Sequence, residues 1–236
     1  MSEEPSFSSL VMVGTVHRDP RGYGKLLRIL EREAPGFITV EISPYALEFR
    51  AKMAFGLRAA LRENLKKIQR EEGAPCRRLF SCGEIQGIFL LLKVPFEWRA
   101  AEKYAQRREI GLKPIDLSAY AEEKLSQISE LIRLDNLRGL LKIPRPPIEE
   151  QVCRQYERAR SLWRLPSETG FTSAEIQERE EHMAREIRRL MEGNRRRKFL
   201  HIGGWEHLLP AFSGKSLFAR LEDLNPRRLL LGDEGR

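Results

Sequence analysis

The sequence predicts an α/β fold: a mainly parallel central sheet with flanking helices and a helical insertion between Tyr45 and Glu192. Short apolar runs bounded by Gly, Pro or Asp are typical of buried strands, and longer stretches with helical spacing lie between them. Strands that alternate with helices favour a parallel sheet. Because the strands gather near both ends of the chain, we expect the helices of the middle to form a cap or side layer over the sheet.

Each expected element is bounded by a change of pattern. The expected strands are residues 10–13, 37–42, 112–115, 198–202 and 228–231. Helical spacing covers residues 22–33, 45–72, 85–108, 118–134, 149–162 and 173–192. The segment I-P-R-P-P at residues 143–147 breaks the helices, because proline lacks an amide donor and restricts the residue before it.

The helix expected at residues 173–192 carries charge on its core-facing side. Its start is marked by a capping signal that consists of Thr172, Ser173 and Glu175. Its apolar face is formed by Ile176, Met183, Ile187 and Leu190. At about 100° per residue, Arg179 and Glu180 fall within the same arc. Because burying charge is costly unless it is paired or used, this helix borders a polar cleft or carries a structural ion pair.

Length and composition predict one folded domain over residues 1–236, with 41% hydrophobic residues to build its core. The formal net charge is +8, from 42 Lys and Arg against 34 Asp and Glu. No apolar run approaches the roughly 20 residues of a membrane span, and the first ten residues do not resemble a signal peptide, so we expect a cytoplasmic protein. The three cysteines, Cys76, Cys82 and Cys153, lack C-x-x-C spacing and are expected to be reduced thiols.

Two of the four histidines close a Gly-x-x-His motif, at residues 14–17 and 204–207. Each motif follows directly on an expected strand, so both imidazoles belong to loops at the carboxyl ends of strands. In open α/β sheets, ligands bind at that edge. His182, in the middle of an expected helix, and His201, inside an expected strand, receive no role.

Glu41 ends the apolar run F-I-T-V of an expected strand and belongs to the same sheet edge as His17 and His207. Two imidazoles and a carboxylate suit a divalent transition metal such as Zn, Mn or Co. Alternatively, one histidine is a general base that Glu41 orients, and no metal is needed. Asp116, at the end of the third strand, is either the N-cap of the next helix or a member of the site. Glu206 is interpreted as a solvent-facing loop residue rather than a second carboxylate of the site.

Five segments spread over most of the chain form an ordered set of motifs. They are G-T-V-H at 14–17, P-G-F-I-T-V-E-I-S at 35–43, E-W-R-A-A-E-K-Y-A and K-P-I-D between 97 and 116, E-R-E-E-H-M-A-R-E-I at 178–187, and I-G-G-W-E-H-L at 202–208. In this order the set resembles the TraB/PrgY/TIKI family.

The resemblance implies the fold shared with erythromycin esterases and ChaN-like proteins, an α/β sheet with helical additions. It also implies hydrolysis, because some members of this superfamily are metal-dependent proteases and others are esterases or peptide-pheromone shutdown factors. Carried over motif by motif, the functional positions are His17, Glu41, Arg179, Glu180 and His207. The chain departs from the family pattern at Trp205 and Glu206, where two small residues are usual. It departs again after Glu41, where Arg50 is the nearest candidate for the family's arginine.

The leading hypothesis is a metal-dependent hydrolase that cleaves an amide or ester bond in a small peptide or peptide-like substrate. His17, Glu41 and His207 hold the metal, Glu180 is a base or a further ligand, and Arg179 stabilises the developing oxyanion. The alternative is a non-enzymatic peptide-binding protein of the pheromone-shutdown type, which keeps the cleft but not the reaction. The bulky loop around Trp205 and the displaced arginine motivate this alternative.

Nucleic-acid binding is a third hypothesis, based on the net charge and on the basic run at residues 194–198. It is disfavoured, because basic residues at that place complement the dipole of the preceding helix and acidic residues interrupt any continuous basic stripe elsewhere. The sequence leaves the oligomeric state open and allows a homo-oligomer.

Overall fold

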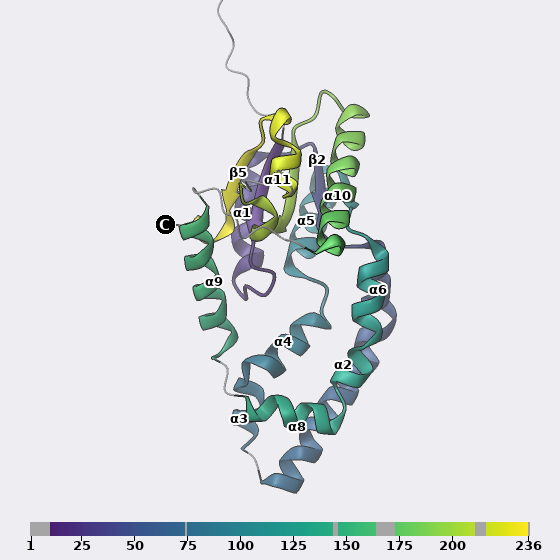
Figure 1. Cartoon of the computed structure of the whole chain (residues 1–236), viewed down its shortest axis with the longest axis vertical. Coiled ribbons are helices and arrows are strands. Elements are labelled where there is room, and N and C mark those ends of the chain that lie inside the picture. The colour runs from purple at the N-terminus through teal and green to yellow at the C-terminus, as the bar shows by residue number, and fades with distance from the viewer. Residues whose placement is uncertain (1–9, 74, 144–145, 164–172, 211–215, 236) are drawn as a thin grey trace, which may run out of the picture.

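A five-stranded parallel sheet lies in the upper half of the molecule as seen in Figure 1, with helices packed on it. The computed structural model describes residues 10–73, 75–143, 146–163, 173–210 and 216–235. The strands are β1 (Leu10–Thr15), β2 (Phe37–Val40), β3 (Gly111–Pro114), β4 (Phe199–Gly204) and β5 (Arg227–Leu230). They are arranged in the order β3-β2-β4-β1-β5, and neighbouring strands run parallel. The five expected strands and the α/β class are therefore confirmed.

Helices cover both faces of the sheet. On one face, α1 (Gly22–Glu33) and α5 (Phe96–Arg108) share a core with Val11 and Val13 of β1. On the other face, α10 (Ala174–Glu192) and α11 (Leu217–Arg220) share a core with Leu10 and Met12. The alternation along β1 follows from the two-residue period of a strand. Because both faces are covered, β1 and β4 are buried at every position.

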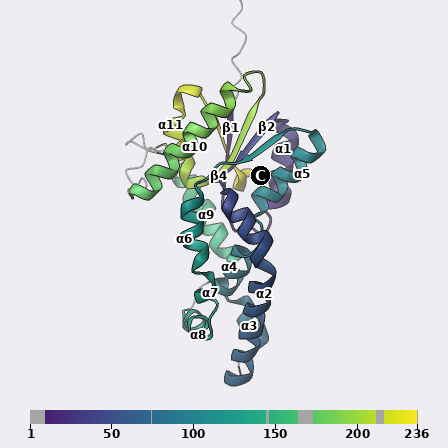
Figure 2. The same ribbon diagram turned by 90° about the vertical axis from the view of Figure 1, so that its right-hand side faces the viewer.

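Helices from the middle of the chain form an extension that reaches away from the carboxyl ends of the strands (Figures 1 and 2). They are α2 (Pro44–Glu72), α3 (Cys76–Ser81), α4 (Gly83–Leu91), α6 (Ser118–Ser126), α7 (Ile128–Leu131), α8 (Leu134–Lys142) and α9 (Ile148–Leu162). Between them the chain returns to the sheet once, through α5 and β3. The extension shares one continuous core with the α1 face of the sheet.

Several helix boundaries differ from the expected ones. The stretch 85–108 is two helices, α4 and α5, because Pro95 has extended backbone angles and begins α5 as its N-cap. The stretch 118–134 is divided between α6 and α7, and α8 follows where no helix was expected. The short α3 and α11, and the 3₁₀ turns η1 (Trp205–Leu208), η2 (Glu222–Leu224) and η3 (Leu231–Asp233), were not expected either.

The start of α10, the break between α8 and α9 and the state of the cysteines were also predicted from the sequence. α10 begins at Ala174, with the Ser173 hydroxyl accepting from the Ile176 amide at 3.3 Å, whereas Thr172 lies outside the described residues. The break between α8 and α9 is confirmed, although residues 144–145 within it lie outside the described part. Cys82 and Cys153 are free thiols, and the side chain of Cys76 is not described. No helix in the described ranges is long and apolar enough to cross a membrane.

Candidate functional site

The carboxyl ends of the three central strands bring the predicted site residues together. His17 follows β1, Glu41 follows β2, and His207 lies on η1 directly after β4. Because β4 lies between β1 and β2, the residues after these strands meet although His17 and His207 are distant in sequence. The amide of Glu41 continues the sheet by donating to the carbonyl of Ile202 at 2.8 Å. The convergence expected from the sequence is therefore present.

Glu41 is the centre of the cluster, and its side chain is only 4% exposed. Its Oε1 lies 2.9 Å from Nε2 of His207 and accepts from the Arg179 guanidinium at 3.0 Å. Its Oε2 accepts from the Gly204 amide at 2.6 Å and lies 3.9 Å from Nε2 of His17. Both imidazoles thus present the same nitrogen, Nε2, to one carboxylate.

Each imidazole is held from behind by a second carboxylate. Nδ1 of His17 lies 3.0 Å from Oε1 of Glu97, and Nδ1 of His207 is hydrogen-bonded to Oε1 of Glu180. A carboxylate only accepts, so Nδ1 carries a proton in both rings. Glu97 is 3% exposed and Glu180 is fully buried. Metal-binding histidines in proteins are typically oriented in this way, with the second ring nitrogen donating to a carboxylate.

The charges in the cluster shift several pKa values. Loss of solvent lowers the pKa of both site histidines, but the neighbouring carboxylates outweigh it: the hydrogen bond to Glu97 and the charge of Glu41 raise the pKa of His17 to about 8. The charge of Glu41 and the hydrogen bond to Glu180 raise the pKa of His207 to about 10. Burial raises the pKa of Glu41, yet the charges of His207, His17 and Arg179 hold it well below the usual range. The cluster therefore concentrates charge around the buried carboxylate of Glu41, and His17, whose side chain is 51% exposed, is its most solvent-accessible member.

Arg179 and Asp116 form a bidentate ion pair beside Glu41. The Arg179 guanidinium donates to the two carboxylate oxygens of Asp116 at 2.9 and 2.8 Å. Burial works to lower the pKa of Arg179, but the hydrogen bond to Asp116 and the charge of Glu41 raise it. The expectation that Asp116 caps the next helix is wrong, because Leu117 occupies the N-cap position of α6 and no side chain caps that helix. Asp116 instead fixes the arginine that holds Glu41.

Gly203 and Gly204 form a floor without side chains beneath the cluster, which we call the glycine cradle. A Cβ on Gly203 would lie 2.9 Å from both Glu41 Oε2 and His201 Nε2, and a Cβ on Gly204 would lie 2.9 Å from His17 Nε2. Such contacts are too close for a carbon atom. Any residue other than glycine would therefore push the site side chains out of place.

Three polar atoms, one beside the cradle and two in the carboxylates behind the imidazoles, are buried and have no hydrogen-bond partner. They are Oε2 of Glu97, Oε2 of Glu180 and Nε2 of His201. Unpaired buried polar atoms are costly and uncommon in native proteins. Three of them in one cluster indicate a place where a further polar group or ion is accommodated.

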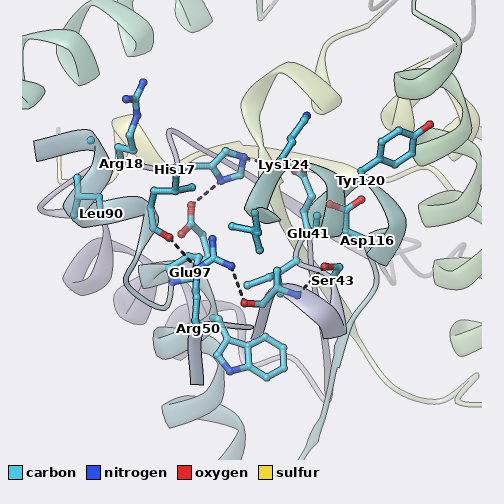
Figure 3. Close-up of a pocket in the computed structure, with 18 of the residues that line it drawn as sticks. His17, Arg18, Glu41, Ser43, Arg50, Leu90, Glu97, Asp116, Tyr120 and Lys124 are labelled. Carbon is cyan, nitrogen blue, oxygen red and sulfur yellow. Dashed lines mark hydrogen bonds and ion pairs between the residues drawn. The ribbon is translucent and has the colours of Figure 1, made fainter. Parts of the chain in front are cut away.

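A cavity of about 540 Å³ opens between the site and the helical extension (Figure 3). His17, Glu41, Glu97, Asp116 and Arg179 line its sheet side. Apolar side chains from the extension line the opposite side, among them Ile88 and Leu90 of α4, Leu125 of α6 and Leu140 of α8. The cavity thus joins a charged end to an apolar end, as is usual for a small-molecule site.

Arg50 lines this cavity but does not join the charged cluster. Its guanidinium donates to the carbonyls of Leu91 at 3.1 Å, Lys93 at 3.0 Å and Ala46 at 2.8 Å, which ties α2 to the carboxyl end of α4. A cation is favourable at that end of a helix. Arg179, rather than Arg50, is the arginine in contact with Glu41.

The bulky residues of the second Gly-x-x-His motif point away from the cavity. Trp205 is 3% exposed, lies against Gly14, and donates from its indole nitrogen to Gln155 of α9 at 3.3 Å. Glu206 is partly exposed. Neither residue lines the cavity, so the departure of this motif from the family pattern leaves the site open.

Sequence reasoning did not single out Glu97, and it gave His201 no role. Glu97 lies within one of the quoted motifs, but a glutamate in the first turn of a helix is common and carries no signal of burial. His201 is an imidazole inside an apolar strand directly before two glycines, and that unusual pattern was the available signal. Glu180, expected as a base or ligand, lies behind His207 and does not line the cavity.

Among the described residues, no three His, Cys, Asp or Glu side chains are already gathered as a set of metal ligands. In comparisons with protein-family models, curated proteins and solved structures, nothing matches the chain. The resemblance to the TraB/PrgY/TIKI family therefore stays a prediction from the motifs.

Proposed function

We propose that the chain is a metal-dependent hydrolase that cleaves an amide or ester bond in a peptide or peptide-like substrate. One observation carries the proposal: His17 and His207 both present Nε2 to Glu41, while Glu97 and Glu180 hold the opposite nitrogens. General acid–base chemistry by one histidine needs one such pair, whereas a metal site uses both.

The residues fit a divalent transition metal. Two imidazole nitrogens and a carboxylate are the donor set of many catalytic zinc sites. Ligands that share a zinc ion lie roughly 3 to 3.5 Å apart, and the contacts of Glu41 with the two imidazoles, at 2.9 and 3.9 Å, lie on either side of that range. The glycine cradle leaves room beside the same atoms. We therefore assign the metal, Zn, Mn or Co, to His17, Glu41 and His207.

When bound, such a metal lowers the pKa of a water molecule and polarises the carbonyl to be attacked. Glu97 lines the cavity and has one free carboxylate oxygen, so it is the residue best placed to accept a proton from water at Oε2. Arg179, on the same wall, holds Glu41 and stabilises negative charge that develops on the substrate oxygen. Glu180 positions His207 and is not assigned a proton-transfer role.

The apolar side of the cavity supports a substrate with an apolar group next to the bond to be cleaved. Leu90, Leu125 and Leu140 from three helices of the extension surround that space. The non-enzymatic alternative rested on a bulky loop at Trp205, which lies outside the cavity, so the structure offers that alternative no further support. Nucleic-acid binding is not favoured either, because Lys198 of the basic run pairs with Glu33 at 3.0 Å.

The test is elemental analysis of the protein purified without added metal, combined with its thermal unfolding with and without Zn, Mn and Co salts. We expect close to one transition metal per chain in the wild type, loss of that metal in His17→Ala, and retention in His182→Ala, since His182 lies on α10 and outside the cavity. Hydrolysis of a panel of peptide and ester substrates would be lost together with the metal. A protein that binds none of the three metals and shows no thermal shift would exclude the proposal.

A further inference from the structure

His201 lies in the middle of β4, the central strand, where a buried imidazole is unusual. Its neighbours across the sheet are Met12 on β1 and Thr39 on β2, and it is 0% exposed. The other residues of β4 are apolar or glycine. A buried polar ring lowers stability unless its nitrogens are used, so each of the two nitrogens has to be accounted for.

Only one of the two nitrogens has a protein partner. Nδ1 of His201 lies 3.0 Å from the hydroxyl of Thr39, whereas Nε2 is buried and has no hydrogen-bond partner. A valine or leucine at this position would fill the strand without that cost. The unpaired nitrogen is therefore the feature that needs an explanation.

The unpaired nitrogen faces the glycine cradle. His201 and Gly203 lie on the same face of β4, since they are two residues apart in a strand. Nε2 of His201 and Oε2 of Glu41 both lie 2.9 Å from the position that a Cβ of Gly203 would occupy. Without a side chain at residue 203, nothing from that residue separates the nitrogen from the carboxylate of the proposed metal site.

The hydrogen bond to Thr39 sets the chemistry of the free nitrogen. If Nδ1 donates to the Thr39 hydroxyl, Nε2 presents a lone pair and no proton, which is the form in which an imidazole binds a metal. This mirrors His17 and His207, whose Nδ1 atoms are held by carboxylates while Nε2 faces Glu41. Nε2 of His201 then borders the Glu41 carboxylate from the side of Gly203, while Nε2 of His17 and of His207 face that carboxylate directly.

We propose that His201 is a fourth protein ligand of the metal, reached from the floor of the site through the space that Gly203 leaves open. The proposal rests on the proposed function, because it needs the metal at His17, Glu41 and His207. A ligand from the floor closes the buried side of the ion and leaves the coordination position on the cavity side for substrate or water.

The experiment compares cobalt binding in the wild type, His201→Leu, Thr39→Val and the matched control His182→Leu. Binding constants are measured by competition with a chelator, and the visible absorption spectrum of bound Co(II) reports its coordination. We expect His201→Leu to lose more than about 100-fold in cobalt affinity and to change the spectrum, because losing a ligand exceeds the 10- to 100-fold cost of losing a residue behind a ligand. Thr39→Val, which keeps the imidazole, should lose roughly 10-fold.

Thermal unfolding of the metal-free proteins separates a ligand from a packing residue. We expect metal-free His201→Leu to unfold near the wild-type temperature, because the change removes the unpaired nitrogen but also takes Nδ1 from the Thr39 hydroxyl. We also expect it to lose most of the stabilisation that cobalt gives the wild type. If His201→Leu does not fold, Thr39→Val carries the test through its affinity and spectrum.

The measurements distinguish a wrong role for His201 from a wrong metal site. Wild-type cobalt affinity and spectrum in His201→Leu, with binding lost in His17→Ala, would overturn the role of His201 and leave the metal site standing. Retention of cobalt in His201→Leu and in His17→Ala would overturn both the role of His201 and the proposed metal site. Unchanged affinity in His182→Leu, with losses in the other two variants, supports the assignment.

Discussion

Two buried glutamates at opposite ends of the sheet show how the same residue type is used in different ways. Glu33 ends α1 at the amino edge of the sheet, and Glu41 follows β2 at the carboxyl edge; their side chains are 5% and 4% exposed. Glu33 is surrounded by Arg32, Lys198 and Arg227, which all carry permanent charge. Glu41 faces two imidazoles as well as an arginine.

The partners decide what each carboxylate is able to do. At Glu33, burial raises the pKa, but hydrogen bonds from Lys198, Arg32 and Arg227 outweigh it and lower the pKa. No unpaired buried atom is found there among the described residues. At Glu41 the imidazoles can lose protons to a metal, and three buried atoms nearby are unpaired. The amino edge is therefore a closed ion pair network, whereas the carboxyl edge is chemically open.

The largest effect is expected at Glu41. Glu41→Gln removes the charge that both imidazoles and Arg179 face, so we expect hydrolysis to fall by at least about 10³-fold, a loss typical of a residue that acts as part of a catalytic unit. Steady-state kinetics on the best substrate of the panel, with metal content measured in parallel, checks this. Activity within tenfold of the wild type would contradict the central place of Glu41.

The second largest effects are expected at Glu97 and Glu180, the carboxylates behind the imidazoles. Glu180→Gln and Glu97→Gln leave the metal ligands in place but weaken their orientation, and we expect metal affinity to fall by about 10- to 100-fold. At saturating metal, Glu97→Gln should still hydrolyse substrate more slowly than the wild type, because Glu97 is proposed to accept a proton. Glu180→Gln should regain most of the wild-type rate of hydrolysis under the same condition. Competition with a chelator measures the metal affinity of each variant, and rates of hydrolysis over a metal titration show which variant recovers. Equal recovery in both variants would remove the proton-transfer role of Glu97.

The glycine cradle is tested by a single methyl group. Gly203→Ala places a carbon where Glu41 and His201 lie too close, and we expect about a tenfold loss of metal affinity as these side chains move. Gly36→Ala, at the amino edge, meets only the side chain of Arg197, at 3.3 Å, and should leave metal binding unchanged. Calorimetric titration of both proteins checks the contrast, and the same affinity in both would show that the cradle does not need to be open.

The smallest effect on the site is expected at Glu33. Glu33→Gln should leave hydrolysis unchanged and lower the free energy of unfolding by about 1 to 3 kcal/mol, the range for hydrogen bonds to a charged group. Because the pKa of Glu33 is lowered by folding, its contribution is present above the pKa of the unfolded chain and is lost as the pH falls through the folded value. The difference between wild type and variant in urea unfolding should therefore begin to shrink as the pH falls below the ordinary glutamate value of about 4.3 and disappear only below the lowered folded value. A difference that persists in acid would assign the effect to packing.

The sequence predicted the sheet and the meeting of His17, Glu41 and His207 because both depend on local patterns. Short apolar runs give strands, and residues directly after parallel strands share one edge. Arg179 and Glu180 were also found from a local pattern, their place on the apolar side of α10. The order of the strands was not specified by the residues beside them, whereas the division at Pro95 had a local signal in the proline itself.

Glu97 and His201 were missed because their roles depend on distant partners. Glu97 becomes a site residue only because α5 packs against the sheet and brings its first turn to His17. The role proposed for His201 likewise depends on Gly203, which leaves space, and on Glu41, which arrives from another strand. The choice between a cap and a site member was left open for Asp116 for the same reason, since its partner Arg179 comes from α10.

The order of the strands also determines when the protein is able to fold during its synthesis. β4 is made after β1, β2 and β3, yet it is the strand that joins them, with Leu10 and Phe37 both aligned with Phe199. Until β4 leaves the ribosome, the nascent chain holds β1 apart from the β2–β3 pair and has no place for His207. Pairings this distant in sequence form slowly, because a long loop must close first. The centre of the sheet is thus completed late, and a nascent chain that stops short of residue 199 has neither the sheet nor the site.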